Sequence, residues 1–210
     1  MSLHKIKIKL EFDQMTTKTL KHDSYPLMAF STAKDLEDFL EKEGDTISGI
    51  WLKLAKKNSG IVSITHDQAI EVALCFGWID GQAASFDNEY HLLKLTPRGP
   101  KSIWSKRNVG IVDQLIKQKK MRPQGLQKVE EAKSDGRWER AYGGSKDAVV
   151  PEDLIEELKK DQKSYDFFLT LNKANIFAIY FRLQTATKPE TREKRKQVIL
   201  QMLKEGKKFH

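Results

Sequence analysis

The chain has 210 residues, of which 39% are hydrophobic and 31% are charged, and it contains one cysteine, Cys75. This composition is typical of a soluble globular protein that buries a sizeable core, and it excludes a disordered chain and an internal disulfide. No apolar run approaches the roughly 20 residues of a membrane span, and the first residues lack the apolar core of a secretory signal, so we expect a cytoplasmic protein without a membrane span.

The positive charge is concentrated in the second half of the chain. Residues 1–97 contain 11 lysines and arginines against 14 acids, a net charge of −3, whereas residues 98–210 contain 26 against 15, a net charge of +11. A half this basic can attract polyanions such as nucleic acid or acidic lipid headgroups. Lysine-rich helices can also form an ordinary solvated surface. Charge alone does not distinguish such a surface from one that binds a polyanion.

The first half of the chain predicts alternating strands and helices. A threonine three residues before a glutamine, Thr65 and Gln68, has capping-box spacing and predicts the start of a largely apolar helix that ends at Gly77. Two strands joined by the turn residues Asp87 and Asn88 predict a hairpin after that helix. The other predicted elements are strands at 5–12, 26–30 and 49–57 and a helix at 33–43.

After residue 97 the pattern becomes helical, with predicted helices beginning near 106, 123 and 151, two amphipathic helices following, and a final helix over 189–205. The sequence therefore predicts an α+β protein with three parts. These are an N-terminal extension at 1–25, an α+β domain at 26–97, and a basic helical region at 98–210. The α+β domain is expected to have a small, mainly antiparallel sheet and two helices, and the basic region about five helices.

The first candidate site is a set of cations around a tryptophan, in the sequence "KSIWSKRN". A tryptophan face with flanking cations suits stacking on a base or sugar together with contacts to phosphate, and a helix N-terminus there favours an anion. The other interpretation is that the tryptophan packs between the two halves of the chain. The candidate anion-binding residues are Lys101, Trp104, Lys106, Arg107 and Asn108.

The second candidate site is a small-molecule pocket in the first half. On a strand, Trp78, Asp80 and Gln82 share one face, and His91 could approach from the paired strand. A carboxylate beside a tryptophan can have a raised pKa, so Asp80 and His91 are candidate acid and base groups of an enzyme. The alternative is a structural carboxylate paired with a cation such as Arg98, Lys101 or Lys106.

A third interpretation is a protein-interaction module without a ligand. The segment at 137–142 has two arginines and two aromatic residues, a composition typical of interfaces. No nucleotide-binding glycine motif, nucleophile motif or metal-ligand spacing occurs, so we expect no cofactor and no metal, and leave catalysis uncertain and less favoured than binding.

Six dense segments follow one another between residues 30 and 205: "IWLKLAKKNSG", "ALCFGWIDGQ", "LTPRGPKSIWSKRN", "MRPQGLQKVEEAKSDGRWERAY", "VPEDL" and "LQTATKPETREKR". Together they resemble the YdeI/OmpD-associated family, also called bacteriocin-protection proteins, with Gly99 in place of an arginine usual in the third segment. The resemblance implies a link to tolerance of antimicrobial peptides or envelope stress and to a porin, with no reaction attached. Porin contact is not expected for a chain without a secretory signal, and a net charge of +8 would repel a cationic peptide.

Overall fold

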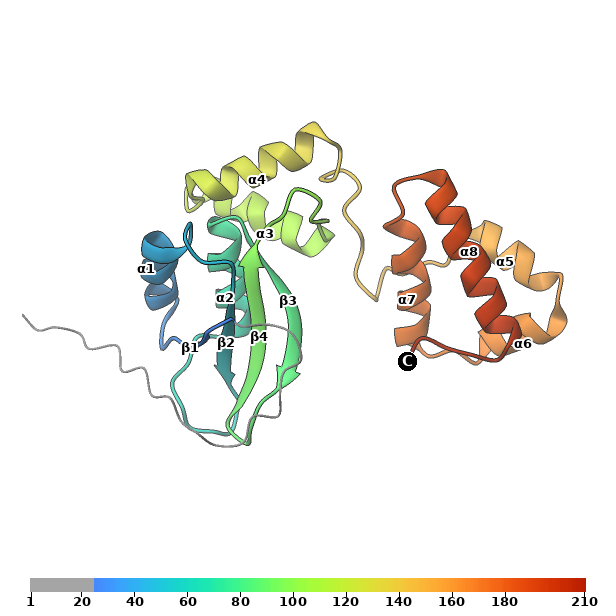
Figure 1. The fold of residues 1–210 in the computed structure, drawn as a ribbon, viewed down its shortest axis with the longest axis horizontal. Helices are drawn as coiled ribbons and strands as arrows, with labels where there is room; N and C mark the ends of the chain where they lie inside the picture. Colours follow the sequence, from blue (N-terminus) through green and yellow to red (C-terminus); the bar gives the residue numbers. More distant parts are fainter. Residues whose placement is uncertain (1–24) are drawn as a thin grey trace, which may run out of the picture.

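The computed structural model describes residues 25–210 (Figure 1), and the strand predicted at 5–12 lies outside the described residues. The first part is a four-stranded sheet with strand order β1-β2-β4-β3. β1 (Leu27–Ala29) pairs in parallel with β2 (Ile50–Ala55), and β4 (Tyr90–Pro97) pairs antiparallel with both β2 and β3 (Trp78–Ser85). The predicted α+β class and the mainly antiparallel sheet are confirmed.

One face of this sheet forms the larger hydrophobic core. The inward-facing leucines and isoleucine of β2 and β4 pack with α1 (Ala33–Glu43) and with α2 (His66–Cys75), which is buried along most of its length. Threonines cap both helices: Thr32 and Thr65 each form a capping box with the side chain three residues later. Cys75 packs in the core. Burial there raises the pKa of its thiol to about 11, so the thiol is protonated at neutral pH.

Two further helices belong to the same core. α3 (Lys106–Lys117) and α4 (Pro123–Ser134) contribute Val112, Leu115 and Val129 to the cluster that contains the sheet residues. Helix α4 packs on the end of α2, where the backbone N–H of Arg122 donates to the carbonyl oxygen of Cys75 over 3.0 Å. The division between cores therefore does not coincide with the domain boundary expected at residue 97, because α3 and α4 bury their apolar faces against the sheet domain.

The last four helices form a separate core. α5 (Glu152–Lys159), α6 (Gln162–Leu169), α7 (Lys173–Gln184) and α8 (Pro189–Lys204) pack around residues such as Leu154, Phe168, Ile179 and Leu203. A bidentate ion pair between Asp153 and Arg192, with contacts of 2.7 and 2.8 Å, fastens α5 to α8. Six helices thus follow residue 98, close to the predicted five, and Figure 1 shows this bundle beside the sheet part, joined to it by an extended segment.

Candidate anion-binding site

The predicted strand face of Trp78, Asp80 and Gln82 is broken by a β-bulge. Asp80 pairs with Leu95, and the next registered pair is Ala83 with Leu93, so Gly81 and Gln82 both lie opposite one residue of β4. A bulge shifts the alternation of side chains by one residue. The prediction that Gln82 shares a face with Asp80 is therefore wrong; Trp78 is buried in the core, Asp80 is half-buried and Gln82 is exposed.

The alternative acid–base pair of Asp80 and His91 is not assembled. His91 pairs with Leu54 and Ser85, four residues along β4 from the partner of Asp80. Four residues of a strand span roughly 13 Å, which is too far for two side chains to share one proton-transfer site. None of the hollows described below is lined by Asp80, Gln82 or His91.

The tryptophan of the predicted anion block lies inside the protein. Trp104 is 2% exposed, with the guanidinium of Arg98 3.5 Å from its ring centre and the ring of Trp138 at 4.8 Å. Its faces are therefore covered by protein, as the packing interpretation expected. Asn108 is also buried; it lies in the first turn of α3, where its N–H donates to the capping residue Ser105, whereas Lys101 and Lys106 are exposed.

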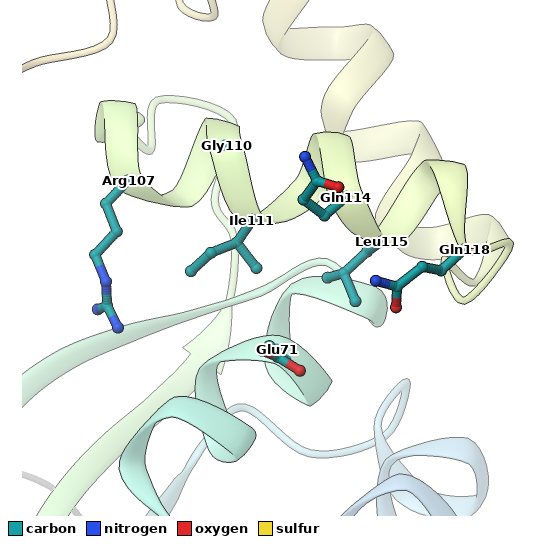
Figure 2. Close-up of a pocket in the computed structure, with 7 residues that line it drawn as sticks. All are labelled: Glu71, Arg107, Gly110, Ile111, Gln114, Leu115 and Gln118. Atoms are coloured by element: carbon teal, nitrogen blue, oxygen red, sulfur yellow. The ribbon is translucent and has the colours of Figure 1, made fainter.

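Among the five candidate anion-binding residues, only Arg107 lines a described hollow, a groove of about 290 Å³ between α2 and α3. Figure 2 shows Arg107 at one end of the groove and Gln118 toward the other, with Glu71 of α2 facing them. Arg107 is already paired with Asp67 over 2.7 Å. Its charge is therefore compensated within the protein, which weakens the groove as an anion site.

The groove also contains a glycine in mid-helix, Gly110, where an added Cβ would meet no atom within 4 Å. Glycine in a helix costs about 0.5–1 kcal/mol relative to alanine because it loses more backbone freedom on folding. We expect Gly110→Ala to raise the free energy of unfolding by about that amount. Urea denaturation measures this, and an unchanged or lower stability would mean that the fold itself needs the glycine.

Arg98 is the most unusual cation of the described chain. It follows β4, is 4% exposed, and donates from one Nη to the carbonyl oxygen of Ile103 over 3.2 Å. Its Nε and other Nη have no hydrogen-bond partner within the described residues. Burial lowers the pKa of Arg98 to about 10, and the nearby carboxylate of Asp80 opposes that effect, so the guanidinium stays charged at neutral pH.

The eight arginines divide into two groups. Four form ion pairs with carboxylates: Arg107, Arg122, Arg137 and Arg192. Within residues 25–210, the other four have no carboxylate oxygen within 4.0 Å; they are Arg98, Arg140, Arg182 and Arg195. Each member of this second group lines, or contacts a residue that lines, one of two adjoining hollows. One hollow lies between the sheet part and the helical bundle, and the other lies within the bundle.

The first of these, which we call the junction hollow, is lined by residues from three distant segments. It takes Ile103 from the loop before α3, Arg137, Arg140 and Tyr142 from the segment after α4, and 184–187 from the end of α7. Its enclosed part is about 40 Å³. Arg98 lies behind it and donates to the carbonyl oxygen of Ile103. Burial raises the pKa of the Tyr142 hydroxyl, an effect that the charge of Arg98 opposes.

The second, which we call the α7 hollow, has a volume of about 380 Å³ and adjoins the first, because Thr185 lines both. Phe177, Phe181, Arg182 and Arg195 form much of its lining. Arg195 of α8 holds the C-terminal end of α7 in place. It donates to the carbonyl oxygen of Arg182 over 2.7 Å and to the hydroxyl of Thr185 over 3.2 Å.

The sequence interpretation had considered Arg137, Arg140 and Tyr142 only as part of an interaction surface, and it missed Arg182 and Arg195. One signal was present. Every arginine lies beyond residue 97, whereas all the cations of the first half are lysines. Arginine offers a planar donor fork that suits carboxylate and phosphate, so a switch from lysine to arginine is informative where total charge is not.

The fold and the site together define a two-part protein, with an α+β part, a helical bundle, and arginine-lined hollows at their junction and within the bundle. Residues 28–128 match a family model described as a domain of unknown function, DUF8412. Residues 147–206 match the model described as "Bacteriocin-protection, YdeI or OmpD-Associated", so the helical bundle is a domain of that family. The predicted resemblance is confirmed for the bundle, which contains Arg182 of α7 and Arg195 of α8.

Neither the curated proteins nor the solved structures include a match to this chain. Within residues 25–210, no helix has both the length and the apolar character needed to cross a membrane. The same part of the chain has no group of three or more histidine, cysteine or acidic side chains arranged to hold a metal ion.

Proposed function

We propose that the protein is a binding module for an anionic ligand, which it holds in the junction hollow. The observation that carries this proposal is the distribution of unpaired arginines. Four of eight have no carboxylate partner in residues 25–210, and all four lie at or directly behind the two adjoining hollows. The other four arginines each pair with an acid; one of them, Arg137, also lines the junction hollow.

The chemistry of these groups favours an anion with several oxygen atoms. A guanidinium forms short, charge-assisted hydrogen bonds to carboxylate or phosphate, often two at once. Arg140 is exposed and donates one Nη to the carbonyl oxygen of Asp135 over 2.9 Å, which leaves its other donors for a ligand. Behind it, the buried charge of Arg98 adds to the positive potential, because a cation with little solvent around it is poorly screened.

The bundle's family description also bears on the biological role. We propose that this protein contributes to tolerance of antimicrobial peptides or envelope stress. It would do so through the bound anion or through a protein partner. Direct sequestration of cationic peptides is disfavoured by the net charge of +8. A pocket enzyme based on Asp80 finds no support in the arrangement of Asp80 and His91.

Isothermal titration calorimetry with inorganic phosphate and pyrophosphate tests the proposal. We expect saturable binding that weakens as salt is added, and a roughly tenfold loss of affinity in Arg140→Gln, the size of one charged hydrogen bond. Arg107→Gln is the matched control, since it removes the same charge from an exposed arginine that is already paired with Asp67.

Two outcomes would overturn the proposal. The first is the absence of saturable binding to either anion at low salt. The second is an equal loss of affinity in Arg140→Gln and Arg107→Gln, which would show that the anions respond to overall charge instead of to the junction hollow.

A further inference from the structure

The α7 hollow differs in chemistry from the junction hollow. Its walls include two phenylalanine side chains, Phe177 and Phe181, whose ring centres are 5.9 Å apart at an angle of 39°. Both rings are half-buried, so each keeps some surface that faces the hollow. Its volume, about 380 Å³, lies within the range of small-molecule sites, whereas the enclosed part of the junction hollow, about 40 Å³, admits only a compact group.

The two hollows are joined through shared walls. Thr185 lines both, and the ring of Tyr142, from the junction hollow, meets the ring of Phe181, from the α7 hollow, edge to face at 4.9 Å. The N–H of Gly143 donates to the hydroxyl of Tyr180 over 3.0 Å and fixes this contact between the two parts of the chain. The two hollows are therefore neighbours that share a wall at Thr185.

We infer that the ligand combines a compact anionic group with a planar aromatic ring, as a nucleotide does. The anionic group lies in the junction hollow near Arg140, and the ring lies against Phe177 in the α7 hollow. Aromatic side chains stack on any base because every base has a π-face. Arg182 and Arg195, which line the same hollow without carboxylate partners among the described residues, add cations that suit either a ring face or a second phosphate.

This inference rests on the proposed function and adds the class of the ligand. Calorimetry with three probes separates the two: a nucleoside monophosphate, the matching uncharged nucleoside, and inorganic phosphate. We expect the monophosphate to bind wild-type protein roughly tenfold more tightly than phosphate, the contribution of one stacking contact. Phe177→Leu, which keeps an apolar side chain but removes the ring, is expected to abolish that advantage while leaving phosphate affinity unchanged.

Matched variants and a fourth probe complete the test. Phe167→Leu, in a partly buried position of α6 outside both hollows, should change neither affinity, and Arg140→Gln should weaken the monophosphate and phosphate together. A short single-stranded oligonucleotide that binds more tightly than the monophosphate, with the same dependence on Phe177, would identify a polymer as the source of the same chemistry.

The outcomes are distinguishable. Equal affinity for phosphate and monophosphate, with no effect of Phe177→Leu, would overturn the aromatic part of the ligand and leave the anion site intact. Binding of neither phosphate nor monophosphate would overturn the proposed function as well.

Discussion

Replacing Gly125 by alanine is expected to lower the free energy of unfolding by about 2 kcal/mol, the cost of forcing extra volume into a closely packed contact. Gly125 lies in the first turn of α4, where that helix crosses the C-terminal end of α2. A Cβ there would lie well inside contact distance of the carbonyl oxygen of Cys75 and 2.8 Å from its carbonyl carbon. Backbone atoms cannot rotate away, so the helices would have to separate.

Gly110→Ala is the matched control, because it makes the same substitution in a neighbouring helix where the added Cβ meets open space. The two variants are expected to change stability in opposite directions in the same urea denaturation experiment. A stabilising Gly125→Ala would mean that α4 does not approach α2 as closely as the structure describes.

Elements with strong local signals were predictable from the sequence. The helix predicted at 33–43 has those bounds, and the helix predicted to begin near residue 123 begins at Pro123. A threonine that caps the first and a proline in the first turn of the second act within a few residues of the helix they begin. Such signals are readable because they do not depend on what the helix later packs against.

The extent of the first hydrophobic core and the bulge were not predictable in the same way. The net charge does change sign near residue 97, but charge reflects the surface of the chain. The core to which α3 and α4 belong is determined by their buried faces, which contact α2. Similarly, the prediction for Gln82 assumed regular alternation, and nothing in a short run of small residues shows where β3 gains an extra residue against β4.

The candidate site depends still more on long-range structure. Arginines 98, 140, 182 and 195 are spread over nearly one hundred positions, and the sequence does not show which arginines have acidic partners. That distinction is a property of the folded chain, since Arg137 and Arg140 lie three residues apart and only Arg137 is paired with a carboxylate. The arginines without carboxylate partners therefore favour a site at the junction hollow over the block predicted at 101–108.

Trp104→Ala is expected to lower the free energy of unfolding of the sheet part by about 4 kcal/mol, since it removes one of the largest buried side chains. The loss includes the ring contacts with Arg98 and Trp138 and leaves a buried guanidinium beside a cavity. Trp104→Phe is expected to cost much less, because it keeps an aromatic face beneath Arg98. It also removes an indole N–H that has no hydrogen-bond partner in the described residues.

The same pair of variants separates packing from ligand contact. The carbonyl oxygen of Trp104 accepts from the N–H of Tyr142 over 3.0 Å, so Trp104 helps to position a wall of the junction hollow without lining it. Trp104→Phe should therefore bind phosphate as wild type does, in calorimetry at a temperature where both are folded. The contrary result would be a Trp104→Ala variant that is as stable as wild type but no longer binds phosphate. In that case the Trp104 ring would contact the ligand instead of packing in the core.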